Sequence, residues 1–123
     1  MAKPLLKRRT LRSLGAIAER AMQNDGTIVR PRLLDDGAGG TEPDPAGPER
    51  IATVCGITAL AALPPGAMRD QIAEHGKFLL EVPLAADLQE TDLFEALGQT
   101  YQVTWAPPPD ALAVERIAAL TEA

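Results

Sequence analysis

The chain has 123 residues, which is enough for one ordinary domain with its own core but not for two. Apolar residues make up 46% of the sequence and charged residues 24%, close to the globular norm, so wholesale disorder is excluded. The formal net charge of −5 argues against a protein that coats nucleic acid in general.

The charge is divided unevenly along the chain. Residues 1–20 carry six basic side chains and one acid, for a net charge of +5. Residues 21–123 carry the other six basic side chains and 16 acids, for a net charge of −10. We therefore expect a flexible basic arm over residues 1–10, joined to a single acidic domain over residues 11–123. The Arg-rich opening also resembles an amphipathic transit peptide, which is a second interpretation.

Three residue types that often build reactive sites occur once each, as Cys55, His75 and Ser13. A single cysteine excludes an internal disulfide and a cysteine-based zinc site. A Ser-His-Asp triad would have to use Ser13, which lies in the basic N-terminal stretch. We expect Cys55 to be a core residue and His75 to be a solvated loop residue. The sequence thus predicts neither an enzyme nor a cofactor.

The first half of the chain predicts one helix and two strands. Residues 11–23 repeat apolar side chains at spacings of three and four, which is typical of an amphipathic helix. Residues 27–34 favour a strand, but Pro31 predicts an edge position or a break. Residues 35–48 are rich in glycine, proline and acids, and they predict a turn followed by a mobile loop. Residues 50–60 predict a strand with two apolar faces.

The second half predicts further short strands. An apolar loop at 61–68 precedes a helical turn or two at 69–76, and a strand follows at 77–84. Residues 93–97 and 100–105 predict a hairpin that turns at Gly98-Gln99. Pro107–Pro109 predict a stiff connector rather than a ligand for an SH3-type groove. Periodicity leaves residues 112–120 open between helix and strand. The expected fold is mainly β: a small antiparallel β-barrel of five to six strands with an N-terminal amphipathic helix.

Two acidic groups and the basic arm are candidate sites. Asp35-Asp36, or the set Asp87, Glu90 and Asp92, contain possible metal ligands or an acid/base pair. The stretch 87–92 lacks the glycine and terminal glutamate of an EF-hand loop, so solvated turn acids are the favoured interpretation. For the basic arm, a solvated terminus is favoured over docking on an acidic partner surface, and nucleic-acid contact comes last.

The order of these features resembles the head-closure, or stopper, proteins that join head to tail in long-tailed bacteriophages and gene transfer agents. A short helix (LRSLGAIAERAM) runs into a strand (TIVRP), and a hairpin (LLDDGAGGTE) follows. A strand ending in proline (FLLEVPLAADL) precedes a strand, glycine turn and strand (LFEALGQTYQVTWAPP), completed by AVERIAALTEA. The resemblance covers about residues 11–123. In this family the tail is usually a strand, which favours a strand at 112–120.

The resemblance implies a structural protein of the virion, located at the head–tail interface after synthesis in the bacterial cytoplasm. Such proteins form a homo-oligomeric ring between the portal or adaptor ring and the tail or tail terminator. The ring prevents DNA leakage, while packaged DNA passes through it without specific binding. It involves no membrane, cofactor or metal. The candidate partner contacts are Arg8, Arg9, Arg12, Asp35, Asp36, Leu63, Pro64, Pro65 and Met68.

The loops at 35–48 and 61–68 are expected to reach the lumen or the adjacent rings, with 61–68 as a candidate gate. Two alternatives remain. One is another connector component, namely an adaptor or a tail terminator. The other is a small nucleic-acid-binding barrel that uses the basic arm.

Overall fold

The computed structural model describes residues 22–123. The basic arm and most of the helix predicted at 11–23 lie outside these residues. Only Met22 and Gln23 of that helix are described, and they form an irregular lead into the first strand.

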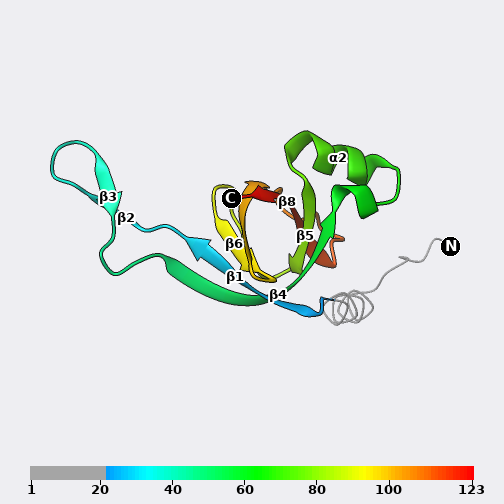
Figure 1. Cartoon of the computed structure of the whole chain (residues 1–123), viewed down its shortest axis with the longest axis horizontal. Helices are drawn as coiled ribbons and strands as arrows, with labels where there is room; N and C mark the ends of the chain where they lie inside the picture. The colour runs from blue at the N-terminus through cyan, green and yellow to red at the C-terminus, as the bar shows by residue number, and fades with distance from the viewer. Residues whose placement is uncertain (1–21) are drawn as a thin grey trace.

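Six antiparallel strands close a barrel (Figure 1). The strands of the barrel, in the order in which they pair, are β1 (Asn24–Arg30), β4 (Glu49–Ala59), β5 (Phe78–Pro83), β8 (Glu115–Glu122), β7 (Gln99–Trp105) and β6 (Leu93–Ala96). The pairing of β1 with β6 completes the circle, so the barrel has no free edge. The prediction of a mainly β fold with a small antiparallel barrel is confirmed.

A separate two-stranded hairpin projects from the barrel between β1 and β4 (Figure 1). Its strands are β2 (Leu33–Asp35) and β3 (Thr41–Pro43), and they pair only with each other. Pro31 separates β1 from β2, as the sequence predicts, because proline cannot donate to a ladder. The mobile loop predicted for 35–48 is in part this ordered hairpin.

Large apolar side chains fill the barrel from alternate positions of its strands. Ile28, Leu80, Phe94 and Leu120 are fully buried there. Gly26 on β1 makes room for the Phe94 ring, since a Cβ at position 26 would lie 2.5 Å from its Cζ atom. Cys55 is also fully buried in this core, as expected.

A second, smaller core lies on the outer face of β5 and β8. The 3-10 turn η1 (Leu60–Ala62) and the helix α2 (Ala67–His75) cover it, with Leu63 and Ile72 packing on Leu79 and Ala119. His75 was expected in a loop, but it ends α2, and its ring stacks on Trp105 with centroids 4.7 Å apart. Within residues 22–123, no helix has the length and apolar character needed to cross a membrane.

In the C-terminal half, the structure corrects the position of one predicted turn and decides between helix and strand for the tail. The turn between β6 and β7 consists of Leu97 and Gly98, both with positive φ, so it lies one residue earlier than predicted. The ambiguous tail is a strand, β8, which pairs with β5 on one side and β7 on the other.

Candidate interaction surfaces

Arg30, Asp87 and Asp92 form an ion cluster at the end of β1. Nε and Nη2 of Arg30 donate to the two carboxylate oxygens of Asp92 at 3.0 and 2.8 Å, and Nη1 donates to Asp87 at 2.9 Å. Asp92 is 2% exposed and also accepts a hydrogen bond from the amide of Gln89. The expectation that Asp92 is a solvated turn acid is therefore wrong.

This cluster serves to position the chain. It joins the end of β1 to the connection between β5 and β6, directly before the projecting hairpin begins. Asp87 remains exposed, and hydrogen bonding to Arg30 lowers the pKa of its carboxyl group. Among the described residues, no group of three or more His, Cys, Asp or Glu side chains is arranged to hold a metal ion.

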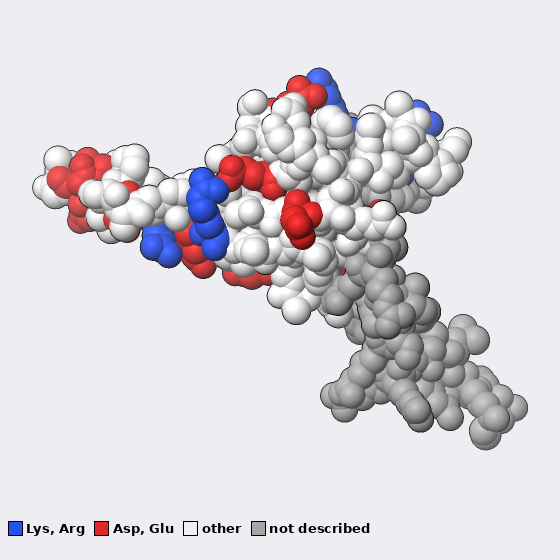
Figure 2. All heavy atoms as spheres, turned by 60° about the horizontal axis from the view of Figure 1, so that its bottom comes forward, with Lys and Arg blue, Asp and Glu red and all other residues white. Residues whose placement is uncertain are grey.

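The hairpin is the most exposed part of the described chain. Every residue from 31 to 43 is exposed, including Leu33 at 60% and Leu34 at 44%. At its base, an open apolar pocket of about 260 Å³ is lined mainly by Val29, Leu33, Pro43, Pro48 and Leu93. Acidic side chains gather on the hairpin, with basic side chains near its base (Figure 2).

Asp35 and Asp36 shape the tip of the hairpin. Asp35 accepts a hydrogen bond from the amide of Gly37, and one oxygen of Asp36 accepts from the amides of Ala38 and Gly40. These backbone hydrogen bonds lower the pKa of Asp36. The two candidate contacts therefore stabilise the turn and leave an exposed, negatively charged tip.

The apolar candidates at 61–68 lie elsewhere, at the start of α2. Leu63 is buried in the small core, whereas Pro64, Pro65 and Met68 are exposed. Figure 1 places α2 and the hairpin on opposite sides of the barrel. The predicted contacts thus form two separate surfaces, and Arg8, Arg9 and Arg12 lie outside the described residues.

A groove that the sequence did not reveal runs beside β8. It has a volume of about 490 Å³ and lies between Gln71 of α2, Trp105 of β7 and the loop from Pro107 to Glu115. Leu112 on its rim is 67% exposed. The proline connector, interpreted as a spacer, forms one wall of this groove.

Glu115, which lines the groove, has a carboxyl group with a raised pKa. Burial raises its pKa to about 7, and hydrogen bonding and charge repulsion from Glu81 add to the increase. The strand register explains the proximity, because Glu81 pairs with Ile117 and Pro83 pairs with Glu115 across β5 and β8. Glu81 and Glu115 are thus diagonal neighbours on the outer face of the barrel.

Comparison with known proteins identifies no relative of this chain. No protein-family model matches the chain, and neither the curated proteins nor the solved structures searched contain a match.

Cys55 and His75 do not form a reactive pair. The thiol is fully buried in the barrel, where burial raises its pKa and the charge of Asp25 adds to the effect. His75 instead stacks on Trp105 outside the barrel. A buried thiol with a raised pKa is a poor nucleophile.

Proposed function

We propose that this protein is a structural connector: a head-closure ring subunit that joins a DNA-filled phage capsid to its tail. In this role the chain acts by assembly, without catalysis, and its partners are copies of itself, the portal or adaptor ring and the tail.

The projecting hairpin is the observation that carries the proposal. An isolated two-stranded hairpin is at best marginally stable in water, and this one exposes two leucines and pairs with no barrel strand. Contact with neighbouring subunits would bury the exposed leucines of such a hairpin and stabilise it. A barrel with a projection on one side also suits a heterologous interface, in which rotation from copy to copy closes a ring.

The charge of the described residues supports the same role. Residues 22–123 carry six basic side chains and 16 acids, a net charge of −10. An acidic wall repels duplex DNA, so a ring of such subunits would let packaged DNA pass without adhering.

Deletion of the gene from the phage that carries it tests the proposal. We expect filled or leaking heads and separate tails in electron micrographs, with virions restored by the wild-type gene in trans. Normal virions from the deletion would refute the proposal.

The basic arm supports a second candidate, a nucleic-acid-binding barrel. That function predicts affinity for duplex DNA that falls with salt and disappears when Lys7, Arg8, Arg9 and Arg12 are changed to alanine. Fluorescence anisotropy with labelled duplex DNA at low salt measures it. Absence of binding by the full chain would dismiss this candidate.

A further inference from the structure

We infer that the groove beside β8 is a docking site for the basic segment of the same chain, residues 3–12 (KPLLKRRTLR). The inference is independent of the proposed connector function, because it concerns only this chain.

The lining of the groove favours an occupant that is both apolar and basic. Trp105, Pro107 and Leu112 provide an apolar wall, while Asp110 and Glu115 are the charged residues that line it. Both charges are negative. A segment that presents leucines to the wall and cations to the carboxylates would complement this surface.

The carboxyl pair lacks a cationic partner among the described residues. The ion pairs there involve Asp87, Asp92 and Glu95, and neither Glu81 nor Glu115. Arg116 follows Glu115 in sequence, but its guanidinium donates to the carbonyl of Ala86. Burial, and next the interaction with Glu81, raise the pKa of Glu115, and a docked arginine would lower that pKa again by favouring the charged carboxylate.

The barrel register brings the start of β1 within reach of this pair. Asn24 pairs with Cys55, and the next residue on β4, Gly56, pairs with Glu81 on β5. Asn24 and Glu81 are therefore two strands apart, or about 10 Å at the usual strand spacing. Arg12 precedes Asn24 by twelve residues, which span about 18 Å even at the short rise of a helix.

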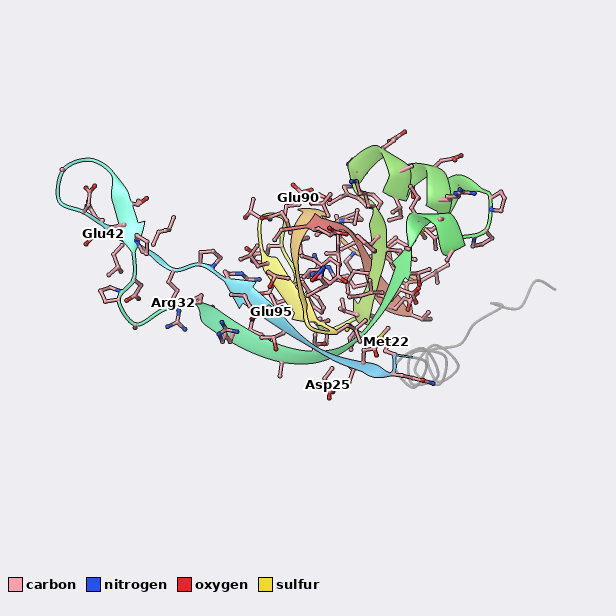
Figure 3. All side chains as sticks on the ribbon, in the orientation of Figure 1. Met22, Asp25, Arg32, Glu42, Glu90 and Glu95 are labelled. Atoms are coloured by element: carbon pink, nitrogen blue, oxygen red, sulfur yellow. The ribbon has the colours of Figure 1, made fainter. Side chains whose placement is uncertain are left out.

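The direction of the chain favours the groove over the acidic hairpin. Met22 lies at one end of β1, whereas Arg32 and Glu42 lie beyond the other end (Figure 3). Between Asn24 and Glu81, the outer face of β4 carries Val54, which is 37% exposed, and Gly56, which has no side chain to project over it.

The composition of residues 3–12 matches the groove. Leu5 and Leu6 suit the wall formed by Trp105 and Leu112, and Lys7, Arg8 and Arg9 follow directly. An arginine fork can bind two carboxylate oxygens at once, so Arg8 and Arg9 are the residues assigned to Glu81 and Glu115.

Trp105 provides the readout, because it is the only tryptophan of the chain and lines the groove. The full-length variant with Arg8→Glu and Arg9→Glu should show red-shifted tryptophan emission and stronger acrylamide quenching than the wild type. The difference should not depend on protein concentration. A further Glu81→Arg and Glu115→Arg exchange in the same chain should restore the wild-type spectrum.

The matched control is Arg32→Glu with Arg50→Glu, two exposed reversals of the same size near the hairpin, the second of which also breaks the exposed Arg50–Glu95 ion pair. These should leave the emission unchanged. An equal change in the control, or no change in the Arg8/Arg9 variant, would overturn the inference. A difference that appears only as concentration rises would assign the groove to the basic segment of a second copy and would also overturn it.

Discussion

Among the described residues, Asp92 is the only buried polar or charged one. Its side chain is buried and accepts both hydrogen bonds of a bidentate arginine. Asp92→Ala leaves the guanidinium of Arg30 partly buried with only the exposed Asp87, so we expect a loss of about 3 kcal/mol in the free energy of unfolding. Urea denaturation measures this loss.

Asp87→Ala is the matched control, since it removes the exposed half of the same cluster. We expect a much smaller loss, because Arg30 keeps its buried partner and exposed ion pairs contribute little. Equal losses from the two variants would show that burial of Asp92 has no energetic consequence.

The same residues show what the sequence does not contain. In the sequence, Asp87, Glu90 and Asp92 stand out as a group of acids, but nothing in it shows which of the three is buried. Their difference depends on Arg30, which lies 62 residues from Asp92 and meets it only because β1 pairs with β6. A contact of this range has no local signal, whereas the buried position of Cys55 was predictable from its apolar strand.

The β6–β7 hairpin carries a strained turn. Leu97 and Gly98 adopt φ of 54° and 74°, a combination that suits asparagine followed by glycine. Leucine in this region is unfavourable, and Leu97 is 62% exposed, so its side chain gains little from packing. We expect Leu97→Asn to raise the free energy of unfolding by about 1 kcal/mol in thermal and urea denaturation. Gly98→Ala should lower it, and a stability gain from that change would contradict the turn geometry.

The β2–β3 hairpin pairs with no strand of the barrel, so we expect the barrel to fold without it. Replacing residues 33–43 by a short Gly-Ser linker should leave the β-type circular dichroism spectrum intact. The free energy of unfolding should change by less than about 1 kcal/mol, because the removed residues are exposed and loop length has a weak effect. Loss of the folded spectrum would show that the hairpin supports the barrel. A Leu33→Ser, Leu34→Ser variant of full length controls for chain length.

Elements that are marked by proline or glycine in their own sequence were predictable. Elements whose structure depends on distant strands of the same chain were not. In the sequence itself, Pro31 marks the start of the hairpin region, and Gly37, Gly39 and Gly40 mark the turn at its tip. The alanine content of the tail at 112–120 favours a helix and the family resemblance favours a strand; from Glu115 onward it forms β8, because β5 and β7 offer pairing on both sides. The groove beside β8 was missed for a similar reason, since α2, β7 and the proline connector meet there only in the folded barrel.

At the scale of the whole molecule, the described chain consists of a closed barrel and of exposed surfaces that project from it or lie on it. The barrel closes its own hydrogen-bonding edges. The hairpin and the exposed prolines before α2 lie on opposite sides of it. Two separate surfaces on one subunit are what a heterologous ring needs, because each copy must meet two neighbours through different faces.

Ring assembly makes a prediction that a monomeric function does not. If each ring needs a hairpin from every subunit, chains without the hairpin should have a dominant-negative effect on assembly when they are co-expressed with the wild type. The fraction of intact rings then equals the wild-type fraction raised to the power of the copy number, so phage titre should fall far more steeply than linearly. Plaque assays over a range of expression ratios measure this, and the exponent gives the copy number. The Leu33→Ser, Leu34→Ser chain, which keeps the hairpin backbone, separates the contribution of the two leucines. A linear fall in titre would mean that each chain acts alone.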